Sequence, residues 1–494
     1  MSTHSLPRAT ARGLVCIACV AAVAAVAQPI PDHPGKLVYG ELMFNPPSAE
    51  EIRTELGNGL VVYALHDPTL PLFSLSVVWP GGTYSDPPGQ EGLRAITASM
   101  MRLGGTAGMT PEALDERLEY LSASIGSWAG LTTSGASCSC LSRDADEVMS
   151  LLGDVLFEPR FDEERLRLRK EEALESLRRR YDGVDQVLGT MRPPMVYGDT
   201  PWGRIQTASA LQRIDRDSLT ACHGDRWVPC NVIVMVSGRF DKEAMPARIQ
   251  ALLARRDRQI GALPPRETRA ELPGASAPGV YLLDKKMPQA AVEISHLGIE
   301  RHHPDYLPLQ IMNRILGGGG FSSRVVRRVR SDEGLAYGVG TFVSAPAGYP
   351  GRLGASLQCA APNAAYASSL VIDELKRIAA EPVTDEELAD AKDAWLDSFP
   401  AMFQTSSDTV QRLGVLEIDE LPRDYYHTLR EQLRAVSKED IQRVAREHIR
   451  PAALRIIIAA DADLVRAGNP AYPVSIEDLG EVHVIVPRDP LEGR

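Results

Sequence analysis

The chain contains the same succession of expected elements twice, and this internal repeat constrains the fold more than any other feature of its 494 residues. Each copy opens with two apolar strands joined by a proline turn. Helices, two further strands and two more helices follow, and each copy closes with a helix that leads into an apolar strand. Order, spacing and even the proline before the last strand agree. We therefore interpret the chain as a duplication of one unit.

Local signals support the individual elements. The stretches "GLVVYALHD" and "LFSLSVVWPGG" alternate as strands do, and "TPEALDERLEYLSA" predicts a helix capped by Thr110 with Pro111 in its first turn. Runs of strands followed by runs of helices indicate an α+β fold rather than a doubly wound sheet. We expect two homologous α/β-sandwich halves that face each other across a cleft, because a cleft between related domains is the default binding site.

A segment rich in Pro, Gly and Ala, "GALPPRETRAELPGASAPG", separates the two copies and predicts a linker. The expected organisation is, in chain order, a signal peptide at 1–27, an extended lead-in segment at 28–50, an N-terminal half at 51–262, the linker at 263–278 and a C-terminal half at 279–494.

The N-terminus has the pattern of an export signal. Arg8 and Arg12 precede the apolar run "GLVCIACVAAVAAVA", which ends in the small residues Ala25 and Ala27. The run is short for a membrane span, and nothing later approaches about 20 apolar residues, so we expect no span after signal removal. We predict an exported, periplasmic protein. A leader with arginines and no acidic residues is also typical of mitochondrial targeting, which is the alternative location.

The formal net charge of −12 argues against one class of partner. The chain has no long run of Lys or Arg, and an acidic surface without a segregated basic patch repels phosphate backbones. We therefore expect no nucleic acid partner.

Five of the seven cysteines lie beyond the signal peptide. Cys138 and Cys140 are two residues apart in an expected strand and so share a face, a spacing that suits neither an ordinary disulfide nor a four-ligand zinc site. Cys222 and Cys230 are compatible with a disulfide or with two small buried thiols, and the sequence leaves both readings open.

The stretch "GLRAITASMMRLGGT" at 92–106 predicts a helix whose apolar face contains Leu93, Ile96, Met100 and Leu103. Together with "NGL" before the first strand and "LGGGGFSSRVVRRVRSDEGLAYGV" in the second copy, it resembles a known family. From about residue 51 onward the chain is similar to the pitrilysin/insulinase-type zinc peptidases, specifically their short bacterial branch that also includes proteins like the mitochondrial processing peptidase.

Active members of that family have an H-x-x-E-H motif on the helix that matches 92–106, with two zinc-binding histidines and a water-activating glutamate. Here the three motif positions are Ala95, Ala98 and Ser99, and the motif occurs nowhere in the chain. Glutamates at 171, 172 and 175 lie where the family has its distal ligand, but one carboxylate cannot replace two imidazoles, and we interpret these glutamates as a solvated helix face paired with nearby Arg and Lys. The resemblance therefore implies a non-catalytic member without a metal of its own.

The histidines offer no local metal motif. His302 and His303 are adjacent, point in different directions and fall in an expected loop, while His448 is one of several isolated histidines. We interpret such residues as surface or core side chains. A relocated metal site would need convergence of residues far apart in the chain, which a sequence does not reveal.

In two-chain members of the family, the zinc-free partner contributes an Arg and a Tyr from an "R-x-x-x-G-L-A-Y" segment, and these positions match Arg330 and Tyr337. A guanidinium and a phenol can hold a substrate carbonyl and the oxyanion formed from it. From the residues alone, Arg330 could instead cap a helix end and Tyr337 could begin a half-buried strand. The glycines at 317–320 are not followed by G-K-[ST], so we expect a loop bordering the cleft rather than a phosphate site.

The resemblance implies a function with two alternatives. We expect a non-catalytic subunit of an exported heterodimeric zinc peptidase, inactive alone, whose partners are a zinc-bearing homologous subunit and a peptide substrate. The alternative is a catalytically dead scaffold or peptide-binding subunit of a larger complex. An independent enzyme with unrelated chemistry is the third reading, and it lacks support because no G-x-S-x-G motif is present.

Overall fold

The computed structural model describes residues 44–56, 60–226, 232–255 and 274–493. The expected signal peptide, most of the lead-in segment and the linker, the "NG" of "NGL", and Cys230 lie outside these residues. None of the described helices combines the length and apolar composition that a membrane-crossing helix needs.

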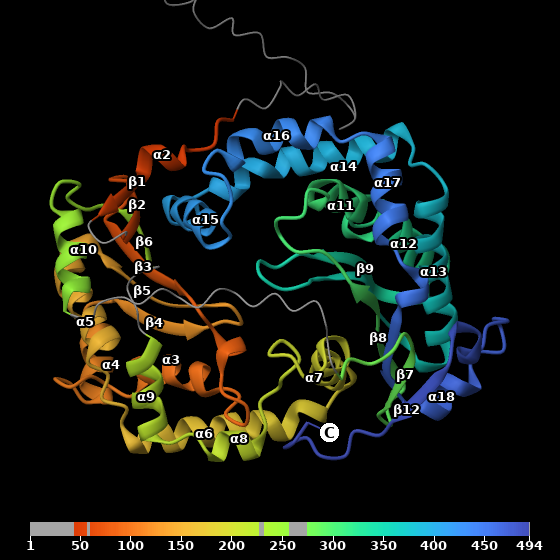
Figure 1. Cartoon of the computed structure of the whole chain (residues 1–494), viewed down its shortest axis with the longest axis horizontal. Helices are drawn as coiled ribbons and strands as arrows, with labels where there is room; N and C mark the ends of the chain where they lie inside the picture. Colours follow the sequence, from red (N-terminus) through yellow and green to blue (C-terminus); the bar gives the residue numbers. More distant parts are fainter. Residues whose placement is uncertain (1–43, 57–59, 227–231, 256–273, 494) are drawn as a thin grey trace, which may run out of the picture. The chain divides into compact units, whose positions relative to one another are not determined.

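The first half is built on a six-stranded sheet in the order β1-β2-β6-β3-β5-β4 (Figure 1). All its neighbours are antiparallel except β2 and β6, which are parallel. The two opening strands and the later pair lie where alternation predicted them. The strands are β1 (Arg53–Leu56), β2 (Leu60–His66), β3 (Leu72–Pro80), β4 (Ser124–Ala129), β5 (Thr133–Leu141) and β6 (Ile233–Gly238).

The second half repeats this sheet in the order β12-β7-β11-β8-β10-β9. Five strands correspond one to one with β2 to β6, but the outer strand differs. In the first sheet it precedes the repeat and is antiparallel, whereas in the second it comes from the chain end and is parallel. The strands are β7 (Gly279–Asp284), β8 (Gln289–Leu297), β9 (Ala336–Ser344), β10 (Arg352–Ala360), β11 (Arg455–Ala460) and β12 (Val482–Ile485).

Helices follow the strands in both halves, and the α+β class with two related halves is confirmed. Thr110 accepts a hydrogen bond from the backbone N–H of Ala113 at 3.3 Å, and Pro111 occupies the first turn, as predicted. The helices are α2 (Ala49–Ile52), α3 (Leu93–Leu103), α4 (Pro111–Tyr120), α5 (Ala145–Phe157), α6 (Glu163–Arg178), α7 (Val184–Tyr197), α8 (Ala208–Gln212), α9 (Arg216–Arg226), α10 (Met245–Ala254), α11 (Tyr306–Asn313), α12 (Arg324–Val326), α13 (Ala364–Ala380), α14 (Asp385–Ser398), α15 (Ser406–Ile418), α16 (Tyr425–Ala435), α17 (Lys438–His448) and α18 (Ala462–Ala467).

The repeat extends to individual hydrogen bonds. Ser127 on β4 donates its hydroxyl to the carbonyl of Ala98 on α3 at 2.5 Å. Thr341 on β9 donates in the same way to the carbonyl of Asn313 on α11 at 3.3 Å. The edge strand of each sheet is therefore fixed to the matching helix at the same position.

The glycine-rich segment is more regular than expected. Gly317 and Gly318 belong to a π-helical stretch, Arg314–Gly318, so the prediction of a loop is wrong for these two residues. A Cβ on Gly317 would lie 2.7 Å from the side chain of Thr341, and Gly320 has a φ of +81°. The segment thus uses glycine for close packing and for one left-handed turn.

The two halves exchange one helix each. Helix α7, from the first half of the sequence, packs on β8 and β11 of the second sheet, and α15, from the second half, packs on β2 and β6 of the first (Figure 1). The two helices are equivalent in the repeat. Gly414 of α15 lies so close to β6 that a Cβ there would meet the Met235 sulfur at 2.4 Å.

Each exchanged helix is joined to its sheet by buried polar contacts. Glu417 of α15 accepts hydrogen bonds from Arg53 at 2.6 Å and from Tyr63 at 3.0 Å. On the other side, Glu293 of β8 is 2% exposed and pairs with Arg192 of α7 at 3.1 Å and with Arg352 of β10. Because these contacts need both partners, each sheet depends on a helix from the other half.

Candidate functional site

Helix α3 keeps the architecture of a metal-binding helix without the ligands. Asp86 accepts hydrogen bonds from the backbone N–H groups of Gly92 and Arg94 at 2.7 and 3.0 Å, which satisfies two donors at the helix start. Burial raises the pKa of Asp86, although these bonds oppose the rise. The predicted apolar face is confirmed at Leu93, Ile96 and Met100 but is wrong at its end, because Leu103 is 43% exposed.

Ser99 stands at the position of the family's second zinc-binding histidine, and its contact with Arg169 excludes zinc. Arg169 on α6 donates a hydrogen bond from Nε to the hydroxyl of Ser99 at 3.2 Å, and its Nη1 lies 3.5 Å from Glu172. Ala98 is buried, and its side chain carries no donor atom. A guanidinium in this position repels a dication, so α3 and α6 do not form a metal site of the family type.

The other two glutamates of α6 behave as the solvated helix face that the sequence allowed. Glu171 is exposed and pairs with Arg167 at 2.5 Å, four residues away. Glu175 pairs in the same way with Arg179 at 2.9 Å. Their carboxylates are engaged along their own helix, and this reading is confirmed.

Arg330 and Tyr337 are brought together by the fold. Arg330 lies in the π-helical segment Arg327–Asp332, and Tyr337 is the second residue of the edge strand β9. The Arg330 guanidinium carbon is 4.7 Å from the Tyr337 ring centre and 4.5 Å from that of Phe321. The guanidinium thus lies within cation–π distance of two aromatic rings, an arrangement that favours a cation.

Both rings are open to solvent, since Tyr337 is 87% exposed and Phe321 is 68% exposed. Tyr337 does lie at the start of a partly buried strand, but its own side chain points to solvent. Arg330 does lie in the last turn of its helical segment, so the favourable interaction with a helix end also applies. Among the described residues, Arg330 has no carboxylate within ion-pair distance. Phe321 was not singled out from the sequence, because its contact with Arg330 spans a turn without regular periodicity.

A buried ion pair fixes the segment that carries Arg330. Arg324 is 5% exposed and forms two hydrogen bonds with the carboxylate of Glu387 on α14, at 2.6 and 2.7 Å. This contact lowers the pKa of Glu387, chiefly through the hydrogen bond from Arg324. Ser323 in turn donates its hydroxyl to the carbonyl of Gly320 at 2.5 Å. The backbone before Arg330 is thereby held at two adjacent residues, Ser323 and Arg324.

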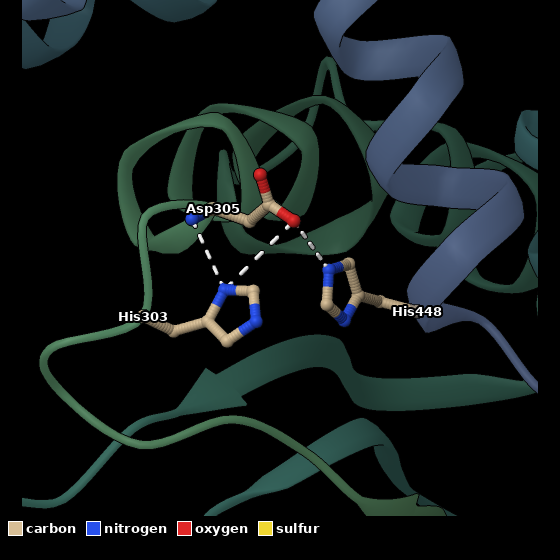
Figure 2. A group of neighbouring side chains, drawn as sticks. All are labelled: His303, Asp305 and His448. Carbon is tan, nitrogen blue, oxygen red and sulfur yellow. Dashed lines mark hydrogen bonds and ion pairs between the residues drawn. The ribbon is translucent and has the colours of Figure 1, made fainter.

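The structure also assembles a cluster that the sequence did not reveal. His303, Asp305 and His448 each offer a ligand-type atom, and these atoms all lie within 4.8 Å of one another (Figure 2). It is the one such group of three among the residues that the structure describes. Asp305 immediately precedes α11 and His448 ends α17, so the residues meet across about 145 positions of sequence. No local spacing connects them, so the sequence does not reveal the cluster.

Comparison with known proteins agrees with the fold and with the missing ligands. A family model described as the peptidase M16 inactive domain matches residues 213–394, a range that includes Arg330 and Tyr337. A protein named an uncharacterized zinc protease of Mycobacterium leprae is 24% identical over 404 residues, covering 81% of this chain and 89% of its own length. The uncharacterized zinc protease YmxG of Bacillus subtilis is 22% identical over 400 residues, covering 79% and 93%.

Solved structures share the whole two-half architecture. The crystal structure of a peptidase M16 inactive domain from Pseudomonas fluorescens superposes with a TM-score of 0.76 at 24% identity, covering 83% of this chain and 97% of that chain. A protease from Helicobacter pylori gives a TM-score of 0.69 at 15% identity, covering 82% and 98%. The family match over residues 213–394 and the relatives named zinc proteases support a place for this chain among the M16 peptidases, and the lack of an H-x-x-E-H motif supports a non-catalytic member.

Proposed function

We propose that the chain is the non-catalytic subunit of an exported heterodimeric zinc peptidase. In this role it helps to bind a peptide substrate and to stabilise the oxyanion at the zinc site of a homologous partner. The observation that carries the proposal is the exposed pair of Arg330 and Tyr337. Helix α3 has no ligands at the motif positions, so two donors of this kind fit the zinc site of a partner.

The arrangement suits a carbonyl or an oxyanion in chemical terms. The Arg330 guanidinium lies over the rings of both Phe321 and Tyr337, and it carries five N–H donors that suit a carbonyl or carboxylate oxygen. The Tyr337 hydroxyl adds a donor beside it. Such groups stabilise developing negative charge because they are oriented before the reaction and need no rearrangement during it.

The zinc ion in this proposal belongs to the partner. Hydrolysis of a peptide bond needs an activated water, which a zinc ion with three protein ligands and one open position supplies. On this chain, α3 provides no ligand, and Arg169 makes its surroundings cationic. Export is proposed from the leader at 1–27, whose basic residues, apolar core and small-residue end fit a signal peptide.

Mixing the two chains tests the assembly. The mature chain alone, a homologue from the same genome with an intact H-x-x-E-H motif and an equimolar mixture would each be assayed on an unstructured peptide. We expect activity in the mixture only, and we expect it to be lost when the H-x-x-E-H motif of the homologue is mutated. Activity of this chain alone would overturn the proposal. Formation of a stable complex without any activity would favour the scaffold alternative instead.

A further inference from the structure

His303, Asp305 and His448 form a compact cluster in the second half, in which Asp305 is buried and both histidines are partly exposed (Figure 2). One carboxylate oxygen of Asp305, Oδ2, lies 2.7 Å from Nε2 of His448 and 3.8 Å from Nδ1 of His303. The two imidazole rings are edge to face, with their centres 5.1 Å apart. Two imidazole nitrogens and a carboxylate oxygen thus come together from the turn before α11 and from the end of α17.

The three ligand-type atoms lie close enough together for one metal ion to reach them all. Nδ1 of His303 accepts a hydrogen bond from the backbone N–H of Asp305 at 3.1 Å, and a metal ion would take the Nδ1 lone pair in place of this bond. Nε2 of His448 faces the same carboxylate oxygen. Ligand atoms bonded to one ion at about 2.0–2.2 Å stand roughly 3 Å apart, so small side-chain shifts convert the present contacts into coordination.

The rest of the surroundings orients the carboxylate and leaves a path to solvent. Arg443 on α17 binds the other oxygen of Asp305 at 2.6 Å, which leaves Oδ2 for the histidines. The hydrogen bond from Arg443 lowers the pKa of Asp305 to about 2, so the carboxylate is charged at neutral pH. The side chain of His303 is 38% exposed, which gives an ion access from the surface.

We propose that His303, Asp305 and His448 bind a divalent transition metal ion of the zinc class, with the remaining coordination positions open to water. Imidazole and carboxylate together are the ligand set for zinc and its neighbours in the first transition row. The ion bridges the start of α11 and the end of α17. The positive charge of Arg443 weakens the attraction for a dication, so the ion is exchangeable rather than permanent.

This inference is independent of the proposed function and departs from the expectation that the chain holds no metal. The cluster shares no residue with α3 and α6, where the family's zinc site would lie, nor with Arg330 and Tyr337. Its bound ion would cross-link two helices of the second half, because His448 ends one and Asp305 precedes the other. The expected consequence is metal-dependent stability of this half.

The test uses Co²⁺ as a spectroscopic probe on the mature chain and on two variants. His303→Ala removes a partly exposed ligand and should fold normally, and His302→Ala removes the neighbouring histidine as a matched control. We expect one Co²⁺ per chain with visible absorption bands, displaced by Zn²⁺. We expect the affinity to fall at least about tenfold in His303→Ala and to stay unchanged in His302→Ala. Zn²⁺ should raise the melting temperature of the control but not of His303→Ala.

The proposal is overturned if the chain gives no Co²⁺ spectrum, or if His303→Ala and His302→Ala bind the ion equally. A second ligand variant, His448→Gln, distinguishes coordination from a general surface effect. It keeps a polar side chain beside Asp305 but loses the imidazole, so it should lose the spectrum as well. Circular dichroism of each variant confirms that the fold is retained.

Discussion

Arg169 on α6 donates a hydrogen bond to the hydroxyl of Ser99 on α3 across 3.2 Å. In active members of the family, a zinc ion joins the helices that match these two. Here a guanidinium and a hydroxyl make the connection, so a cation remains beside α3 while the ligands are gone. Helices α3 and α6 are therefore joined here by a direct side-chain contact that includes a cation.

Restoring the motif alone should not restore zinc binding. We expect the triple variant Ala95→His, Ala98→Glu and Ser99→His to take up little zinc, because Arg169 lies at the site. Adding Arg169→Ala should raise zinc affinity at least about tenfold by removing a like charge. The comparison is made by calorimetry in a His303→Ala background, so that the proposed surface site does not contribute. Equal zinc binding with and without Arg169 would contradict this account of the site.

The helix exchange predicts long-range effects of local mutations. Leu188→Ala in α7 removes a side chain that is packed against the second sheet, and should cost about 2–5 kcal/mol of unfolding free energy. Gly414→Val in α15 should clash with Met235 of the first sheet and cost about 1–3 kcal/mol. Hydrogen exchange should show the loss of protection in the sheet of the opposite sequence half. Loss confined to the mutated half would contradict the exchange.

The buried carboxylate of Glu293, which pairs with Arg192 of α7, should contribute far more to the unfolding free energy than an exposed carboxylate does. Glu293→Gln leaves Arg192 and Arg352 without their shared negative charge in a 2% exposed position, and should cost about 3–5 kcal/mol. As a matched control, Glu171→Gln breaks an exposed pair with Arg167 and should cost about 0–1 kcal/mol. Urea unfolding of both variants checks the difference. Similar costs would mean that the Glu293 cluster is not a structural requirement.

Three cysteines should be unreactive in the folded chain. Burial raises the pKa of Cys138 to about 12, of Cys140 to about 11 and of Cys359 to about 12, because it disfavours the charged thiolate. At about pH 8 almost no thiolate forms, so iodoacetamide should label these sites only after unfolding. Mass spectrometry of the digested protein gives the extent at each site. Rapid labelling of native Cys140 would show that its strand is not packed as described.

Much of the fold was predictable because the repeat supplies two independent readings of each element. The alternation of β2 and β3, the capping of α4 by Thr110 and the charged helix α6 all follow from local rules. Helix α7 does not, since Pro193 and Pro194 lie inside it and normally mark a helix end. It is helical in this fold because its apolar side chains are buried against a sheet that lies far along the chain, which local periodicity does not encode.

The candidate site was likewise predictable from the sequence only in part. The absence of ligands at Ala95, Ala98 and Ser99 is visible in the sequence, whereas the contact with Arg169 depends on how two helices pack. The pairing of Arg330 with Tyr337 was expected from the family resemblance, but their spacing alone left it undecided. The cluster around Asp305 depends entirely on tertiary contacts. Periodicity also does not show where an apolar face stops, and this explains the error at the end of α3.

The most direct test of the central claim is the turnover rate of the assembled peptidase when Tyr337 is replaced. Tyr337→Phe keeps the ring that stacks on Arg330 and removes only the hydroxyl. Tyr120→Phe is the matched control, because Tyr120 is also exposed, at 78%, and also stacks with an arginine, Arg117 at 5.1 Å. We predict that kcat of the mixture falls at least about tenfold in Tyr337→Phe, towards the 10²–10³ typical of a lost oxyanion donor, and stays unchanged in Tyr120→Phe. Equal kcat values for the two variants would contradict the claim that this chain donates a catalytic group to its partner.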